Sequence, residues 1–283
     1  MNSSWQSYLR LLPDNLKNAA NKYRDNLQEL RLRVGQSTEV VTASGSHRLA
    51  NQCTCQELDY VINMASQYSP WSSDTLHHGY ITAEGGHRVG ICGRAVVQGS
   101  EIRGMRNPTS VCIRVARDLP VAGGDIQQLT GSILIIGAPG TGKTTLLRDL
   151  VRIRSNGGGE TIGVVDERCE IFPHVNGVPC FPYGKSTDIL YGCPKTAGGE
   201  ILLRCMTPHT IVLDEITSES DCNGIMHISW CGVDVICTAH AADRKDLYSR
   251  PVYKPLVQSE LFDWLIVMHP DKHYTFERMK SCT

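Results

Sequence analysis

The sequence lacks the features that place a chain in a membrane or, by charge alone, on a nucleic acid. No apolar run approaches the roughly 20 residues needed to span a bilayer, and the first residues carry no basic segment followed by an apolar one. We therefore expect no signal peptide and no direct membrane span, so that any membrane association runs through a partner. The formal net charge is −1 and aromatic residues make up 6% of the chain. Without a cationic field or many stacking platforms, a nucleic-acid partner is disfavoured.

The 12 cysteines show no C-x-x-C pair, and their closest spacing is Cys53 to Cys55. Paired ligand spacing is the usual sequence sign of a zinc site, so no zinc site is expected. Several cysteines stand within apolar runs, as Cys112, Cys205 and Cys237 do. We interpret them as reduced, buried thiols that act as small hydrophobic side chains, which indicates a reducing compartment.

The hydrophobic pattern divides the 283 residues into two parts. In residues 1–124, helical spacing at 9–23 and 56–67 is combined with strand-like segments at 29–34, 88–91, 94–97 and 110–115, which predicts a smaller α+β N-terminal domain. Residues 122–125, Ala-Gly-Gly-Asp, are the expected linker. In residues 125–283, apolar runs at 132–137, 161–166, 210–214, 233–238 and 263–268 alternate with helical segments. This alternation predicts an α/β domain with a mainly parallel sheet.

A complete phosphate-binding motif follows the first of these apolar runs. The pattern G-x-x-x-x-G-K-[ST] is met by Gly137, Ala138, Pro139, Gly140, Thr141, Gly142, Lys143 and Thr144, with Thr145 next in the expected helix. Glycines let successive backbone N–H groups curl around a phosphate, and the helix N-terminus adds favourable dipole charge. Lys143 is expected to reach the β- and γ-phosphates, and the Thr144 hydroxyl to ligate Mg²⁺. The motif therefore predicts a site for a nucleoside triphosphate, ATP, with Mg²⁺.

The apolar run that begins at residue 210 ends in adjacent carboxylates, Asp214 and Glu215. This is the Walker B arrangement of P-loop NTPases, in which the aspartate holds Mg²⁺. Glu215 then projects at the γ-phosphate and polarises the attacking water. Two surface acids after a strand are the alternative interpretation, and the phosphate loop upstream favours the catalytic one.

Two further strands point to the RecA-like branch of this class. The run at 163–165 lies between the two motifs and ends in Asp166 and Glu167, and the run at 235–238 is followed by His240. A strand between the phosphate loop and Walker B, together with the acid after Asp214, is typical of RecA-like rather than kinase-like domains. His240 is a candidate sensor of the γ-phosphate because of its place in the chain after Glu215.

In this order the motifs resemble those of the secretion ATPases of type II and type IV systems. In that superfamily a phosphate loop, an acidic box, Walker B and a histidine box follow one another. By this resemblance Glu167 belongs to the acidic box and His240 to the histidine box, and both join Lys143 and Glu215 as candidate catalytic residues. Most of the chain is moreover similar to the stage III sporulation protein AA family, through residues 27–33, 79–82, 86–90, 165–168, 193–195 and 238–240.

The resemblance implies a cytoplasmic ATPase of the mother cell in spore-forming bacteria. It would energise or assemble a secretion-like channel around the forespore, with membrane-embedded channel proteins as partners and a hexameric ring as its homo-oligomer. The family also implies that arginines from an adjacent domain or subunit complete the nucleotide site. The candidates are Arg88, Arg94, Arg103, Arg106, Arg114 and Arg204.

Two other functions stay open on the sequence alone. The six arginines from Arg88 to Arg117 suggest a RecA-like nucleic-acid-remodelling ATPase, although solvated arginines on strand edges and loops are the simpler interpretation. A nucleotide-dependent binding switch with little turnover is the other alternative, and the intact Glu215 argues against it.

Overall fold

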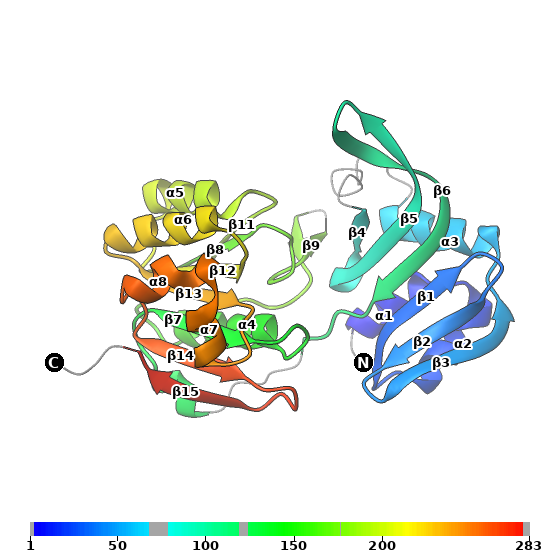
Figure 1. The fold of residues 1–283 in the computed structure, drawn as a ribbon. Coiled ribbons are helices and arrows are strands. Elements are labelled where there is room, and N and C mark those ends of the chain that lie inside the picture. Colours follow the sequence, from blue (N-terminus) through cyan, green and yellow to red (C-terminus); the bar gives the residue numbers. More distant parts are fainter. Residues whose placement is uncertain (1–2, 68–78, 119–123, 176, 280–283) are drawn as a thin grey trace. The chain divides into compact units, whose positions relative to one another are not determined.

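The computed structural model describes residues 3–67, 79–118, 124–175 and 177–279, which form two compact units (Figure 1). The first unit comprises Met1–Arg117 and Pro173–Phe181, and the second comprises Asp118–Phe172 and Pro182–Thr283. The boundary between the units thus falls after Arg117, whereas the sequence pattern predicts that the first domain ends at residue 124. The expected linker at residues 122 and 123 lies outside the described residues, and its last two positions begin a 3₁₀ turn, Gly124–Gln128.

The first unit is built on a six-stranded antiparallel sheet with the strand order β3-β2-β1-β6-β5-β4. A 3₁₀ turn at Glu84–Gly86 connects β4 to β5. The elements are α1 (Ser3–Arg10), α2 (Asp14–Lys22), β1 (Leu27–Arg33), β2 (Ser37–Thr42), β3 (Gly45–Gln52), α3 (Cys55–Ser66), β4 (Tyr80–Ala83), β5 (His87–Gln98) and β6 (Glu101–Arg114).

Local sequence explains where the helices of the first unit begin. The helical pattern expected over residues 9–23 is two helices, because Pro13 stands at the N-cap of α2 and cannot donate a backbone hydrogen bond within a continuous helix. A capping box starts α3, in which the Thr54 side chain accepts from the Glu57 backbone at 3.2 Å and the Glu57 carboxylate accepts from the Thr54 backbone at 2.7 Å. The apolar side chains of these helices and of the sheet form one core, which includes Trp5, Tyr8, Leu16, Leu30, Leu58, Val89 and Ile113.

One short segment from the second part of the sequence belongs to the first unit. Residues Pro173–Phe181 form a hairpin of β9 (His174–Val175) and β10 (Val178–Pro179). The hairpin packs beside the 3₁₀ turn, where a Cβ on Gly86 would lie 3.0 Å from the Pro173 ring. The sequence pattern did not indicate this return.

His87 is a fully buried, neutral side chain in the first unit. Its Nδ1 accepts the Ala116 backbone N–H at 3.0 Å, so the ring proton sits on Nε2, which donates to the Ser4 carbonyl at 2.7 Å. Burial lowers the pKa of His87 to about 4, against a smaller raising effect of the Ser4 hydrogen bond. The fold therefore disfavours the imidazolium form at this position.

Acidification is expected to destabilise the first unit through His87. Between pH 6.5 and 4 the unfolded chain binds a proton that the folded unit does not, so stability falls as the pH falls, by about 2 kcal/mol between pH 7 and pH 5. His87→Gln, which has no titrating ring, should lose correspondingly less over this interval. Urea unfolding at pH 7 and pH 5 is monitored by hydrogen exchange of the backbone amides in β1 and β6, which reports the stability of the first unit alone. Equal losses in the two proteins would contradict this role of His87.

The second unit is built on a seven-stranded sheet with the order β11-β8-β12-β13-β7-β14-β15. All neighbouring strands are parallel except β14 and β15. The α/β expectation for this part of the chain is confirmed. The elements are β7 (Ile133–Gly137), α4 (Lys143–Asn156), β8 (Ile162–Asp166), β11 (Thr187–Tyr191), α5 (Lys195–Cys205), β12 (Thr210–Ile216), α6 (Glu219–Trp230), β13 (Asp234–Ala239), α7 (Arg244–Ser249), α8 (Lys254–Gln258), β14 (Trp264–Met268) and β15 (Tyr274–Arg278).

Helices cover both faces of this sheet. Alternate residues of β7, Leu134 and Ile136, belong to the core that includes α5 and α6, whose side chains Leu202, Ile225 and Ile228 pack there. Because successive strand residues point to opposite faces, Ile133 and Ile135 face the other side, where α4 contacts β7 and β13. Burial on both faces explains why these strands read as continuous apolar runs in the sequence.

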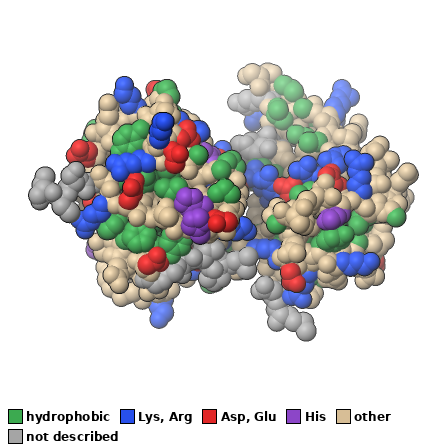
Figure 2. Space-filling model, turned by 60° about the horizontal axis from the view of Figure 1, so that its bottom comes forward, with side chains coloured by type: hydrophobic (Ala, Val, Ile, Leu, Met, Phe, Trp, Pro, Cys, Tyr) green, Lys and Arg blue, Asp and Glu red, His purple; other side chains and the backbone are tan. Residues whose placement is uncertain are grey.

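The described residues bear on three expectations from composition. Their cysteines are free thiols. Cys53, Cys222 and Cys237 are buried, but Cys112 is half-buried and Cys55, Cys92, Cys205 and Cys231 are exposed, so the expectation of buried thiols holds for only part of them. No helix among the described residues is both long and apolar enough to cross a membrane. Acidic and basic side chains are interspersed on the face drawn in Figure 2, in keeping with the formal net charge of −1.

Candidate functional site

The phosphate loop connects β7 to α4 in the second unit. All residues of β7 are buried, and Lys143 at the end of the loop is buried as well. Gly137 starts the loop, and a Cβ there would lie 2.7 Å from both the Met268 carbonyl oxygen and the Thr141 hydroxyl. Gly142, before the helix, has a φ of +104°, a conformation that favours glycine. The glycines of the motif are therefore required by the local backbone.

Lys143 turns its side chain back over the loop. Its Nζ donates to the Gly137 and Ala138 carbonyl oxygens at 2.9 and 3.0 Å, and lies 3.1 Å from His240 Nδ1. Burial lowers the pKa of Lys143, while the carboxylates of Asp214 and Glu215 raise it. The ammonium is thus held at the mouth of the loop, where it can meet an incoming phosphate.

Strand order explains how separate motifs meet beside this loop. In the sheet, β13 lies between β7, which carries the loop, and β12, which carries Asp214 and Glu215. The carboxyl ends of parallel strands meet at one edge of the sheet, where open α/β folds bind ligands. Residues that follow β13 therefore lie between the phosphate loop and the two acids.

Asp214 links the start of α4 to β13. Its Oδ2 accepts from the Thr144 hydroxyl at 2.7 Å, and its Oδ1 accepts from the Thr238 hydroxyl and, at 3.0 Å, from the Glu215 backbone N–H. Thr144 and Asp214 thus present a hydroxyl and a carboxylate side by side. Thr238 orients the carboxylate, and sequence reasoning had not assigned it a role in the site.

Glu215 occupies an irregular position in its strand. The register between β12 and β13 shifts between Leu213 and Ile216, and Glu215 has a φ of +51°, a conformation that costs about 1 kcal/mol or more for a residue with a side chain. The backbone is held there by a hydrogen bond of 2.8 Å from Glu215 N–H to the Thr238 hydroxyl. Bulges of this kind re-aim side chains, and here the Glu215 carboxylate is aimed at two cationic or polar partners.

Those partners are Arg168 and His240. Arg168 Nη1 lies 2.7 Å from Glu215 Oε2, and His240 Nε2 lies 3.0 Å from Glu215 Oε1. If Lys143 donates to His240 Nδ1, the ring proton sits on Nε2 and is donated to Glu215. Lys143, His240, Glu215 and Arg168 therefore form one continuous chain of polar contacts.

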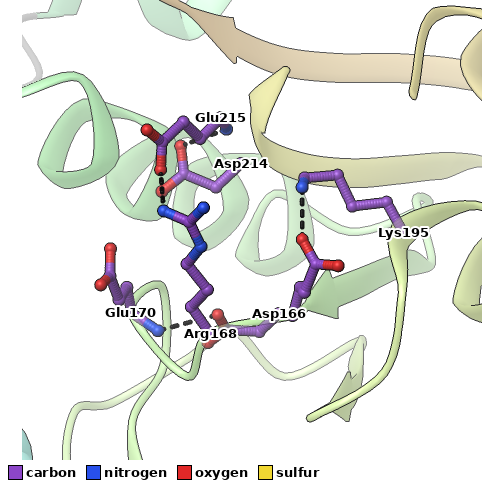
Figure 3. A pocket seen from close by; sticks show the side chains of 7 residues that line it. Asp166, Arg168, Glu170, Lys195, Asp214 and Glu215 are labelled. Carbon is purple, nitrogen blue, oxygen red and sulfur yellow. Dashed lines mark hydrogen bonds and ion pairs between the residues drawn. The ribbon is translucent and has the colours of Figure 1, made fainter. Parts of the chain in front are cut away.

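The loop after β8 forms a pocket next to this chain (Figure 3). The buried Asp166 carboxylate accepts backbone N–H groups of Glu170, Ile171 and Phe172 at 2.8–3.0 Å, which fixes the loop at its root. Burial raises the pKa of Asp166 to about 6, against the lowering effect of these hydrogen bonds. The pocket is lined by Asp166, Glu167, Arg168, Glu170, Lys195, Asp214 and Glu215.

Glu167 lines this pocket, but its carboxylate binds Lys195 rather than a residue of the phosphate loop. Lys195 is buried at the start of α5 and lies 3.9 Å from Asp221 as well. The catalytic role of Glu167 stays a prediction. The adjacent residue, Arg168, reaches Glu215 instead, as Figure 3 shows. Arg168 and Lys195 both stand in segments similar to the family, yet neither was given a role in the site.

The candidate arginines belong to other elements than those that carry the phosphate loop and the two acids. Arg204 is exposed on α5 and pairs with Glu200 at 3.6 Å. The others lie on β5 and β6 of the first unit, where Arg114 pairs with Glu29 at 3.1 Å and Arg88 stacks over the Tyr80 ring. Arg94 and Arg106 face each other across the two strands and are exposed. Their part in completing a nucleotide site stays a prediction, as it does for Arg103.

The oxygen donors at the start of α4 suit Mg²⁺. This ion prefers oxygen ligands, keeps several waters and binds through one or two protein groups together with phosphates. Thr144 and Asp214 offer such a pair. Among the described residues, no cluster of three or more His, Cys, Asp or Glu side chains could hold a metal by itself.

The fold is similar to those of two solved proteins, an ATPase and a pilus retraction motor. The Legionella pneumophila ATPase DotB superposes with a TM-score of 0.60 at 15% identity, over 94% of this chain and 80% of DotB. The pilus retraction motor PilT, solved with bound ADP, gives a TM-score of 0.62 at 12% identity, over 94% of this chain and 83% of PilT.

Sequence comparison defines the family. The family model for Sporulation stage III, protein AA matches residues 7–276. Stage III sporulation protein AA of Bacillus subtilis (strain 168) is 34% identical over 267 residues, which are 89% of this chain and 87% of that protein. Protein SEEDLING PLASTID DEVELOPMENT 1 of Arabidopsis thaliana is 24% identical over 89% of this chain but only 36% of its own length. The chain belongs to the Sporulation stage III, protein AA family, and the resemblance predicted from the sequence is confirmed.

Proposed function

We propose that the chain is a Mg²⁺-dependent ATPase that energises or assembles a secretion-like channel between mother cell and forespore during sporulation. The observation that carries the ATPase part is the convergence of Lys143, Thr144, Asp214 and Glu215 at the ends of β7, β12 and the start of α4. The sporulation part rests on family membership. The likeness of the fold to that of the ATPase DotB supports the ATPase part.

In this proposal each residue has a defined task in hydrolysis. Lys143 and the backbone N–H groups of the loop bind the β- and γ-phosphates. Thr144 and Asp214 hold Mg²⁺, which when bound neutralises charge on the phosphate oxygens. Water attacks the γ-phosphorus, Glu215 accepts a proton from that water, and the bond from the γ-phosphorus to the bridging oxygen breaks. ADP and inorganic phosphate leave, and the proton on Glu215 returns to solvent.

The oligomer and its location form the second part of the proposal. We place the protein on the cytoplasmic side of mother-cell membranes, held there by membrane-embedded channel proteins. We propose a hexameric ring in which arginines such as Arg94 and Arg106 approach a neighbouring nucleotide. Their exposure and the lack of an acidic partner for either among the described residues support this role.

Removing Mg²⁺ tests the ATPase proposal directly. Purified protein is expected to release phosphate from ATP with Mg²⁺ and to lose that activity in excess EDTA, because Thr144 is neutral and Asp214 is anionic, so neither offsets the negative charge of the triphosphate when the cation is absent. Native mass spectrometry with and without a non-hydrolysable ATP analogue should show a nucleotide-dependent increase in oligomer size. Turnover that is unaffected by EDTA would contradict the metal site. ATP binding without any turnover would favour the nucleotide-dependent switch.

A further inference from the structure

The ladder of hydrogen bonds between β12 and β13 is interrupted at the candidate base. Leu213 pairs with Cys237 and Ile216 pairs with Ala239, so two residues of β12 stand opposite Thr238 alone. In a bulge of this kind the regular pairing of the two strands is locally lost. Because buried backbone N–H and C=O groups are nearly always hydrogen-bonded, the groups around this bulge need partners from outside the two strands.

Tyr253 supplies one such partner. It ends a 3₁₀ turn, Pro251–Tyr253, between α7 and α8, and is buried in the core of the second unit. Its hydroxyl accepts from the His240 backbone N–H at 3.2 Å and donates to the Ile216 carbonyl oxygen at 3.2 Å. Burial raises the pKa of Tyr253, against the lowering effect of the His240 hydrogen bond, so the hydroxyl keeps the proton that it donates. One hydroxyl thus joins the end of β12 to the residue that follows β13.

This bridge closes a ring of contacts that includes the candidate base. Glu215 directly precedes Ile216, and its carboxylate lies 3.0 Å from the His240 ring. The ring of contacts runs from the Glu215 carboxylate through His240 to the Tyr253 hydroxyl, and returns through Ile216 to the Glu215 backbone. Glu215 has a φ of +51°, a conformation that persists only where the surrounding structure holds it. The Tyr253 hydroxyl therefore fixes the spacing of the two strand ends on which Glu215 and His240 stand.

A second hydroxyl at the bulge holds a different group. Thr238 accepts the Glu215 backbone N–H at 2.8 Å and donates to the Asp214 carboxylate. Thr238 therefore fixes the beginning of the bulge together with the carboxylate proposed to hold Mg²⁺, while Tyr253 fixes its end. Loss of the Tyr253 hydroxyl leaves Asp214 with its hydrogen bonds to Thr144 and Thr238. Its effect should fall on the base and not on the binding of ATP with Mg²⁺.

We propose that Tyr253 is a positioning residue for hydrolysis, which keeps Glu215 aimed by joining Ile216 to His240. This role rests on the proposed ATPase function and adds a residue outside its sequence motifs. Tyr253 acts through the backbone of the two strand ends and not on ATP itself. A general base has to lie within hydrogen-bond reach of the proton that it accepts, and a displacement of about 1 Å lowers the rate by up to about 100-fold.

The experiment removes the hydroxyl and keeps the ring. Tyr253→Phe in the full chain is expected to lower kcat about 10- to 100-fold while the affinity for ATP with Mg²⁺ stays at the parent level. The matched control is Tyr248→Phe, which removes an exposed hydroxyl bound to Arg244 at 3.2 Å and should keep the parent kcat. Tyr253→Phe combined with Glu215→Gln should be as slow as Glu215→Gln alone, because the loss acts through Glu215.

Two further measurements separate positioning from a purely structural role. In single-turnover hydrolysis, a loss of folded protein lowers the amplitude of the reaction, whereas a misplaced base lowers its rate constant. Hydrogen exchange of the His240 backbone amide in nucleotide-free protein should be faster in Tyr253→Phe than in the parent, because this N–H loses its acceptor. The amides of β7 should exchange as in the parent.

A lower rate constant at the parent amplitude, with faster exchange at His240 and no further loss in the Glu215→Gln background, supports the positioning role. The role is overturned by an unchanged rate constant, by an equal loss of ATP affinity, by a further loss in the Glu215→Gln background, or by a Tyr253→Phe protein that does not fold. A parent protein without Glu215-dependent turnover removes the proposed function itself. An active parent with an unchanged Tyr253→Phe variant removes only the role of Tyr253.

Discussion

Lys143→Ala is expected to lower ATP turnover at least about 100-fold, the scale on which loss of one preorganised group at a developing charge acts. The Lys143 ammonium lies at the mouth of the phosphate loop, bound to the Gly137 and Ala138 carbonyl oxygens and next to His240. Alanine removes the only charged group of the loop motif, so ATP binding should weaken together with turnover. Phosphate release and the affinity for a fluorescent ATP analogue, measured on the same preparation, report both losses.

The matched control for this variant is Lys185→Ala, which removes an exposed lysine outside the loop. It should bind and hydrolyse ATP at the parent level. Thermal unfolding distinguishes a lost phosphate contact from a lost fold, since Lys143 also bridges two loop carbonyls. A folded Lys143→Ala protein that hydrolyses ATP at the parent rate would remove the assignment of residues 137–144 as the nucleotide site.

The α/β fold of the second unit could be predicted where buried strands appear in the sequence as continuous apolar runs. Strands β7, β8, β12, β13 and β14 are buried on both faces and appear as apolar runs, so their positions were found within one or two residues. Strand β11 was not found, because it lies at the sheet edge and its residues are only half-buried or exposed. The hairpin at Pro173–Phe181 was not found either, since its place in the first unit depends on tertiary packing rather than on local pattern.

The candidate site shows the same division between local and tertiary information. The phosphate loop and the Asp214–Glu215 pair are local motifs whose residue types are set by backbone curvature and strand ends. The contacts of Arg168 with Glu215 and of Lys195 with Glu167 depend on the direction in which each side chain points, which is set by the tertiary structure. Spacing cannot decide which of two adjacent residues faces β12. In the structure Arg168 contacts Glu215 and Glu167 contacts Lys195, and the catalytic role of Glu167 stays a prediction. Thr238 was missed because its task depends on the bulge at Glu215.

The second large effect is expected from Glu215→Gln, which should reduce hydrolysis by about 10²- to 10⁴-fold, the usual contribution of a general base. Glutamine has the shape of glutamate and can still contact His240 and Arg168, but its amide cannot accept the proton of the attacking water. Lys143, Thr144 and Asp214 are untouched, so ATP with Mg²⁺ should still bind. Single-turnover measurements should show that hydrolysis is lost. Binding measurements on the same preparation should show that the affinity for ATP is kept.

This separation distinguishes Glu215 from Lys143, whose removal should weaken both binding and hydrolysis. Glu219→Gln, an exposed acid in the first turn of α6, is the matched control and should behave as the parent. If Glu215→Gln turned over ATP normally while Glu167→Gln did not, the base would have to be assigned to the acidic box. The Lys195 contact of Glu167 would then have to break during the cycle. The structure favours Glu215 over Glu167 as the base, because Glu215 is connected to Lys143 of the phosphate loop through His240, whereas the Glu167 carboxylate contacts Lys195.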